Sequence, residues 1–128
     1  MGYKGHKPGL TRFLKSFVFA AQGINNAWKH EMNIRFHVLV AVLTIFLGFT
    51  LKVTPTEWLI LLLTMFVMIS LELVNTAIER TVDLVTDDFK PLAKQAKDVA
   101  AGAVLIFSIG SIIIGVIIFL PKAIRFFN

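Results

Sequence analysis

Apolar residues are concentrated in three long runs along the chain. Each run is about as long as the roughly 20 apolar residues that a helix needs to cross a bilayer. Trp58 opens the second run at the interfacial position in which indole rings are enriched, and Pro121 follows the third run and is expected to end its helix. The pattern predicts three transmembrane helices, over about residues 34–52, 57–84 and 97–120.

A different pattern precedes the first run. Between about residues 10 and 30, apolar residues recur at helical spacing, and polar side chains such as Arg12 and Lys15 take much of the opposite side. This pattern is typical of an amphipathic helix that lies in the membrane interface. Residues 1–9 are expected to form a loose cytoplasmic lead. We therefore predict one all-α integral-membrane domain, residues 1–128, with a surface helix and three spans.

Composition agrees with a membrane protein, and charge orients it. Hydrophobic residues make up 56% of the chain, above the roughly 45–50% of soluble domains, and the lack of Cys excludes disulfides and thiolate metal sites. Of the 13 Lys and Arg residues, only Lys52, Lys122 and Arg125 lie outside the N-terminal region and the second loop. Basic residues favour the cytoplasmic side, so we expect the N-terminus inside and the C-terminus outside. We interpret the net charge of +5 as contact with anionic headgroups, not with nucleic acid.

Polar residues interrupt the second span toward its cytoplasmic end. At about 100° per residue, four of them fall within a sector of about 80° on one helix face: Glu72, Asn75, Glu79 and Asp83. Ionisable groups inside a membrane are costly and indicate a functional site. With Trp58 at the outer boundary, Glu72 lies about 21 Å deep and Glu79 about 31 Å deep. Glu72 therefore suits a proton acceptor among acyl chains, whereas Glu79 and Asp83 can meet water and metal ions.

Further polar residues are expected at the same cytoplasmic level: Glu31, Arg35, Lys97 and Asp98. Carboxylates for Mg²⁺, cations for phosphate and a base for an alcohol are the parts of a metal-assisted phosphoryl transfer. The same acids would also suit a proton or ion relay, such as a small proton-coupled transporter subunit. They could instead only pair with Arg80, Lys94 or Lys97 to fix helix packing. The residues alone leave these three interpretations open.

Two sequence blocks carry a resemblance to a known family. Glu72-Leu-Val-Asn-Thr-Ala-Ile-Glu79 with Val82-Asp83, followed by Ala96-Lys97-Asp98, closely resembles the bacterial diacylglycerol kinase family, and the resemblance covers nearly the whole chain. It implies a small integral-membrane lipid kinase of the bacterial cytoplasmic membrane that uses ATP and Mg²⁺. It also implies a homotrimer whose active sites are shared between subunits and face the cytoplasm.

Within this family the chain resembles the Gram-positive branch, which phosphorylates undecaprenol. The resemblance lies in Asn33-Ile-Arg35-Phe-His37 and in residues 57–63 and 91–104. It implies that undecaprenol is converted to undecaprenyl phosphate, with diacylglycerol as the alternative acceptor, converted to phosphatidic acid by the same mechanism. Phe19 and Ala101 depart from the diacylglycerol branch, in which an aromatic hydroxyl and a Ser commonly stand at these positions.

The resemblance also implies residue roles. Glu72 would be the catalytic base that takes the proton of the lipid hydroxyl, and Glu31 and Glu79 would be the Mg²⁺ ligands. ATP would contact nine residues: Arg12, Phe19, Glu31, Glu79, Asp88, Phe89, Lys90, Lys97 and Asp98. The lipid alcohol would contact five: Arg12, Asn33, Arg35, Glu72 and Asn75. Asp83 would have a supporting role.

The histidines offer one other candidate chemistry. His30 and His37 are seven residues apart, and His6 precedes them. Two imidazoles without a third ligand make a poor zinc site. We therefore interpret the histidines as side chains at the level of the headgroups.

Overall fold

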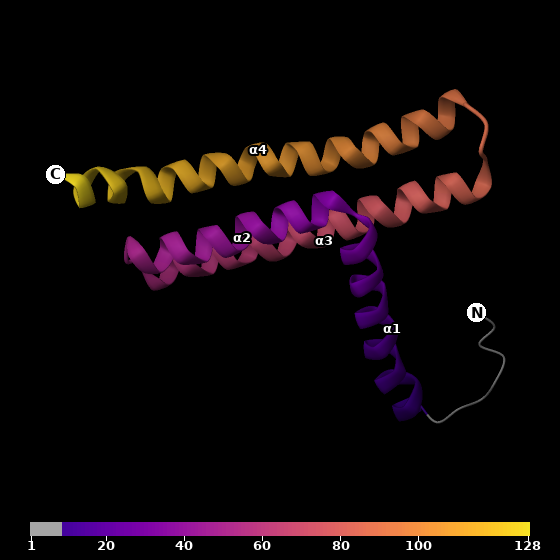
Figure 1. The fold of residues 1–128 in the computed structure, drawn as a ribbon, viewed down its shortest axis with the longest axis horizontal. Helices are drawn as coiled ribbons and strands as arrows, with labels where there is room; N and C mark the ends of the chain where they lie inside the picture. The colour runs from indigo at the N-terminus through magenta and orange to yellow at the C-terminus, as the bar shows by residue number, and fades with distance from the viewer. Residues whose placement is uncertain (1–8) are drawn as a thin grey trace.

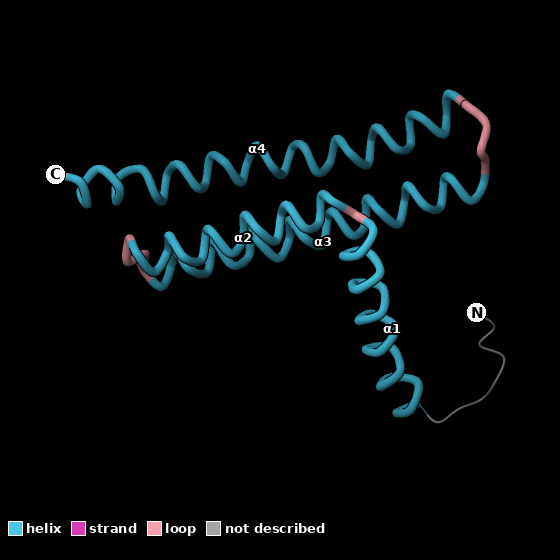
Figure 2. Tube along the Cα trace, viewed as in Figure 1, coloured by secondary structure: helices cyan, strands magenta, loops and turns pink. Residues whose placement is uncertain are grey.

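The computed structural model describes residues 9–128, which form four helices: α1 (Gly9–His30), α2 (Met32–Thr50), α3 (Pro55–Val85) and α4 (Pro91–Phe127). Helix α3 packs against both α2 and α4, and α1 leaves these three at a steep angle (Figure 1). The connections between helices are short (Figure 2). The predicted all-α architecture of a surface helix and three apolar helices is confirmed. The expected cytoplasmic lead lies, except for Gly9, outside the described residues.

Helices α2, α3 and α4 are each long and apolar enough to cross a membrane. Helix α4 differs from the prediction at its end, because it continues through Pro121 to Phe127. The expected end at Pro121 is therefore wrong. A proline removes one backbone hydrogen bond, but a helix in hydrocarbon must satisfy its backbone internally, and the apolar residues Ile124, Phe126 and Phe127 extend the segment that gains from remaining helical.

A single extended residue makes the corner between α1 and α2. Glu31 has φ −111° and ψ 116° and separates two helical segments, while its N–H donates to the carbonyl of Ala27 at 2.8 Å. Ala27 is the one residue of α1 that is buried. The apolar side of α1, with Phe13 against Phe17 at 5.1 Å between ring centroids, is exposed in the single chain. Such a face suits a helix lying in the membrane interface.

The turn between α2 and α3 is closed by polar contacts. Lys52 adopts a left-handed backbone with φ 51°, which turns the chain. Thr54 and Glu57 then form a reciprocal capping box: the Thr54 N–H donates to the Glu57 carboxylate at 2.7 Å, and the Glu57 N–H donates to the Thr54 hydroxyl at 3.3 Å. Lys122 of α4 lies 3.0 Å from the same carboxylate. This end of the bundle therefore links all three long helices.

A small apolar core lies beside this turn. Val53, Leu61 and Ile118 are buried together, and the ring of Trp58 packs against them. Gly48 of α2 lies so close to Trp58 that a Cβ there would come within 2.6 Å of the indole. Most other large apolar side chains are exposed in the single chain. This distribution fits helices whose outer faces meet lipid or other helices rather than water.

Candidate active site

The polar stripe of α3 is buried in its middle part. Glu72, Asn75 and Thr76 are 3%, 7% and 6% exposed, and they are the buried polar residues within the described part of the chain. Buried polar groups need hydrogen-bond partners, and an ionisable one is costly without a partner. The candidate site is therefore described below through the polar partners of these side chains.

Glu72 meets a histidine of the neighbouring helix. Nε2 of His37, on α2, lies 3.1 Å from Oε1 of Glu72, and both side chains are shielded. We had interpreted His37 as a headgroup-level side chain, so this contact is one that the sequence reasoning missed. A count from the turn would have found it: His37 lies 14 residues before Leu51 and Glu72 lies 18 residues after Thr54. In an antiparallel pair, these positions fall within about one helical turn of each other.

Asn75 and Glu79 form the next step along the stripe. Nδ2 of Asn75 donates to Oε1 of Glu79 at 3.0 Å. The other polar atom of this amide, Oδ1, is buried without a hydrogen-bond partner. An unsatisfied buried acceptor costs about 1–3 kcal/mol, so native proteins keep few of them. This oxygen is available to a donor such as a hydroxyl group.

Arg80 connects α3 to the corner between α1 and α2. Its guanidinium donates to Oε1 of Glu31 at 2.9 Å and to Oδ1 of Asn26 at 2.6 Å. Glu31 is therefore held against the residue that follows Glu79 in the chain. Within residues 9–128, no group of three or more His, Cys, Asp or Glu side chains could hold a metal ion.

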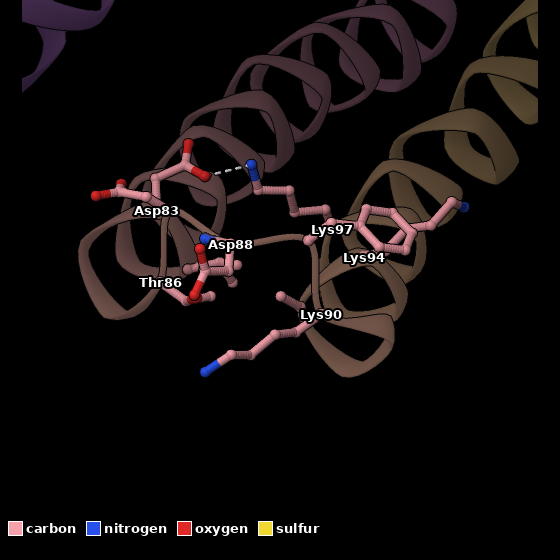
Figure 3. A pocket seen from close by; sticks show the side chains of 10 residues that line it. Asp83, Thr86, Asp88, Lys90, Lys94 and Lys97 are labelled. Carbon is pink, nitrogen blue, oxygen red and sulfur yellow. Dashed lines mark hydrogen bonds and ion pairs between the residues drawn. The ribbon is translucent and has the colours of Figure 1, made fainter.

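A pocket of about 440 Å³ lies where α3 turns into α4 (Figure 3). Four of the residues expected to contact ATP line it: Asp88, Phe89, Lys90 and Lys97. Lys97 reaches from α4 to Asp83 on α3 and forms an ion pair. Asp98 is instead paired with Lys94 along α4. The pocket is open and its charges are exposed, in contrast to the buried Glu72.

The expected site residues form two groups in the single chain. One group lies where the α1–α2 corner meets α3 and contains Glu31, Glu72, Asn75 and Glu79. The other surrounds the α3–α4 turn and contains Asp83 and five of the expected ATP contacts: Asp88, Phe89, Lys90, Lys97 and Asp98. Figure 1 shows that α3 extends well beyond the corner before it reaches this turn. From Glu72 to Asp83 the rise along the axis is about 16 Å.

The remaining expected residues lie on α1 and at the start of α2. Arg12 and Phe19 belong to α1, and Asn33 and Arg35 belong to the first turns of α2, with both of the latter side chains exposed. Lys94 is a pocket residue for which we had expected no nucleotide role. Its position on the same helix face as Lys90 and Lys97 was the available signal, because residues three or four apart share a face.

Comparison with known proteins places this arrangement in a family. Residues 18–119 match the model of prokaryotic diacylglycerol kinase. The chain is 51% identical over 122 residues to an undecaprenol kinase of Bacillus subtilis, which covers 95% of this chain and 99% of that protein. It is 38% identical over 98 residues to a diacylglycerol kinase of Helicobacter pylori, 77% of each chain, and 29% identical over 105 residues to one of Escherichia coli, 82% of this chain and 86% of that protein.

The chain therefore belongs to the prokaryotic diacylglycerol kinase family. Its enzyme class, a lipid kinase of the membrane, is confirmed by this membership and by the three long apolar helices. The higher identity to the Bacillus subtilis protein than to the Helicobacter pylori and Escherichia coli proteins confirms the resemblance to the Gram-positive branch.

Proposed function

We propose that this protein transfers the γ-phosphoryl group of ATP to the hydroxyl of a membrane lipid alcohol, and that the acceptor is undecaprenol. The observation that carries the proposal is the burial of Glu72, a carboxylate 3% exposed on a long apolar helix. Placing an ionisable group inside a membrane costs free energy, so its presence there indicates a functional site. The 51% identity to a protein named undecaprenol kinase supports the choice of acceptor.

The proposed chemistry begins at Glu72. Its carboxylate takes the proton of the lipid hydroxyl while the hydroxyl oxygen attacks the γ-phosphorus of ATP. The bond from the γ-phosphorus to the β–γ bridging oxygen breaks, and ADP leaves with the electron pair. Asn75 is proposed to contact the alcohol because it lies about one helical turn from Glu72 on the same face of α3. The apolar surroundings of Glu72 exclude water that would otherwise compete as acceptor.

A magnesium ion fits the acids that remain. Mg²⁺ takes oxygen ligands and is commonly held by one or two carboxylates together with phosphate oxygens. We propose that Glu31 and Glu79 hold it. When bound, the ion would neutralise charge on the transferring phosphate. Glu79 is oriented for this role by the amide of Asn75, at 3.0 Å.

The nucleotide is proposed to use the basic side of the pocket. Lys90 and Lys97 line it, and ammonium groups attract phosphate oxygens. Asp83 would support this role by holding Lys97 in place through their ion pair. Phe89 and Asp88 complete the expected contacts from the turn, and Asp98 lies one residue beyond Lys97.

We propose that the active site is completed between the subunits of a homotrimer. In one chain Glu72 lies about 16 Å along α3 from Asp83 at the nucleotide pocket, and we propose that a neighbouring subunit brings the pocket and the base together. The large apolar surface that a single chain exposes supports such packing. The proposed orientation has both groups and the N-terminus on the cytoplasmic side, where ATP is found, and the C-terminus outside.

A transfer assay tests this proposal. Purified protein in mixed micelles would be incubated with [γ-³²P]ATP, Mg²⁺ and either undecaprenol or diacylglycerol, and labelled lipid would be counted. We expect faster labelling of undecaprenol. Faster labelling of diacylglycerol, the substrate in the names of the Helicobacter pylori and Escherichia coli relatives, would change the acceptor. If neither lipid were labelled, the proposed transfer reaction would be wrong, and a proton-coupled transporter subunit would be the alternative.

A further inference from the structure

We propose that His37 is a positioning residue for the catalytic base. Its imidazole holds one oxygen of the Glu72 carboxylate on the α2 side, so that the other oxygen is presented to the lipid hydroxyl. This inference rests on the proposed function, because it assigns a role toward the base of that reaction. It concerns a side chain for which neither the acid stripe nor the resemblance implied a role toward Glu72.

The geometry of the pair carries the inference. Nε2 of His37 lies 3.1 Å from Oε1 of Glu72, and the two side chains are 16% and 5% exposed. This N···O distance is that of an ion pair or close polar contact, and the ring nitrogen can act as a donor to the carboxylate when it carries the proton. Either the neutral tautomer with a proton on Nε2 or the imidazolium supplies that donor. The contact joins α2 to α3, so it also sets where the carboxylate lies relative to both helices.

The ring is itself held in place. Phe36 contacts it edge-on, with ring centroids 5.5 Å apart. Arg35, the neighbouring cation on α2, is exposed. The polar partner of Glu72 is thus an aromatic ring with few rotamers and not a long flexible side chain. A glutamate has three rotatable side-chain bonds, and fixing them before the substrate binds lowers the entropic cost of reaching the reactive geometry.

One contact on one oxygen suits a base better than full pairing would. A bidentate cation would occupy both carboxylate oxygens and compete with the proton of the substrate. In contrast, the His37 contact involves Oε1. The adjacent buried acceptor, Oδ1 of Asn75, lies one helical turn along on the same face of α3. The lipid hydroxyl can therefore donate its one proton to the second oxygen of Glu72 while it lies beside this amide.

Steady-state kinetics of two variants test the role. His37→Leu removes the donor at similar volume, whereas His37→Gln retains an N–H near the place of Nε2. We expect His37→Leu to lower kcat for undecaprenol by up to about 100-fold, as a misplaced catalytic group does, with the KM for MgATP unchanged within about twofold. His37→Gln should restore most of the lost kcat. Thr44→Val is the matched control, because Thr44 lies two turns along α2 and bonds only its own helix at Val40; its kcat should equal that of the wild type.

The outcomes separate this inference from the proposed function. If the wild type labels no lipid, the proposed function fails and the role of His37 fails with it. If the wild type is active and His37→Leu retains its kcat, only the positioning role is wrong. A loss in His37→Leu that His37→Gln does not restore would also contradict it, since the hydrogen bond would not be what matters. If His37→Leu loses helicity by circular dichroism, His37→Asn, which is polar but too short to reach, takes its place with the same expectation.

A double substitution supplies a second measurement. In a Glu72→Gln background the carboxylate that His37 positions is gone, so adding His37→Leu should not lower the residual transfer further. A further loss equal to that of the single variant would show that His37 acts independently of Glu72. That result would overturn the proposal.

Discussion

At the start of α3, the carboxylate of Glu57 accepts from the backbone of Thr54 at 2.7 Å and lies 3.0 Å from the ammonium of Lys122. Further along the same helix, the carboxylate of Glu72 is more deeply buried and has a single imidazole at 3.1 Å. The two acids thus share one helix but differ in how completely the protein satisfies them. Glu57 has a backbone N–H and an ammonium as partners that fix the fold, whereas the one contact of Glu72 is made by its Oε1.

The surroundings of the two acids differ in the same way. Near Glu57, Trp58 packs into the small apolar core and closely against Gly48. Near Glu72, the amide of Asn75 retains a buried oxygen without a partner. A site evolved for stability leaves few polar atoms unsatisfied, because each costs free energy. The N-terminal end of α3 therefore holds the helices together, whereas its middle part retains an unsatisfied acceptor.

The largest expected effect separates these two acids directly. Glu72→Gln should lower kcat by about 10²–10⁴-fold, since an amide cannot accept the proton, while binding of MgATP remains. Glu57→Gln is the matched control at the other end of α3, and we expect it to keep its kcat at temperatures where it is folded. Lipid phosphorylation and binding of a fluorescent ATP analogue would measure both quantities. Near-normal turnover in Glu72→Gln would show that the base is elsewhere.

A second substitution on α3, at Glu79, tests whether the base and the metal ligand are different residues. Glu79→Gln should raise the KM for MgATP by about 10–100-fold, as loss of a metal-binding group does. Excess Mg²⁺ should recover part of the activity. Titration of kcat and KM at several Mg²⁺ concentrations would measure this. A variant with lowered kcat and an unchanged KM would instead place Glu79 with the base.

Substitutions near the N-terminal end of α3 should change the stability of the protein. In Gly48→Ala the new methyl group would lie 2.6 Å from the Trp58 ring, which is also confined by Phe49 at 4.9 Å between centroids. Overpacking of this kind costs about 1–3 kcal/mol. Thermal unfolding in detergent, followed by circular dichroism, should show a lower midpoint. Gly23→Ala is the control, because no atom lies within 4 Å of a Cβ there. Equal midpoints in the two variants would indicate that the Trp58 ring moves freely.

The smallest effect is expected from the cap of α3. Thr54→Ala removes the hydroxyl that accepts from the Glu57 N–H and should lower the stability by about 1 kcal/mol. Thr54→Ser keeps an oxygen in this place and should restore it. Thermal unfolding in detergent would measure the stability of both variants, and the kcat of both should be unchanged. If Thr54→Ala lost more activity than folded protein, the turn between α2 and α3 would also influence the active site.

Much of the fold follows from the sequence because a membrane permits few solutions. Backbone groups in hydrocarbon must be bonded within their own segment, so each long apolar run becomes a helix. The amphipathic pattern before the first run likewise indicates a surface helix. The polar stripe of α3 was also predictable, since the spacing of Glu72, Asn75 and Glu79 places them on one helix face. Pro121 shows the limit of this reasoning, because the local rule that proline ends a helix was outweighed by the apolar residues beyond it.

The partners of the polar groups were decided by the tertiary structure alone. His37 with Glu72, Arg80 with Glu31 and Lys97 with Asp83 each join two helices. Such pairs depend on the axial offset and rotation of one helix against another, and these are set by side-chain packing over the whole contact. No local pattern encodes that offset. The sequence by itself therefore determined that α3 carries a stripe of polar residues in a membrane kinase, and only the packing of α2 beside it decided that a histidine would contact Glu72.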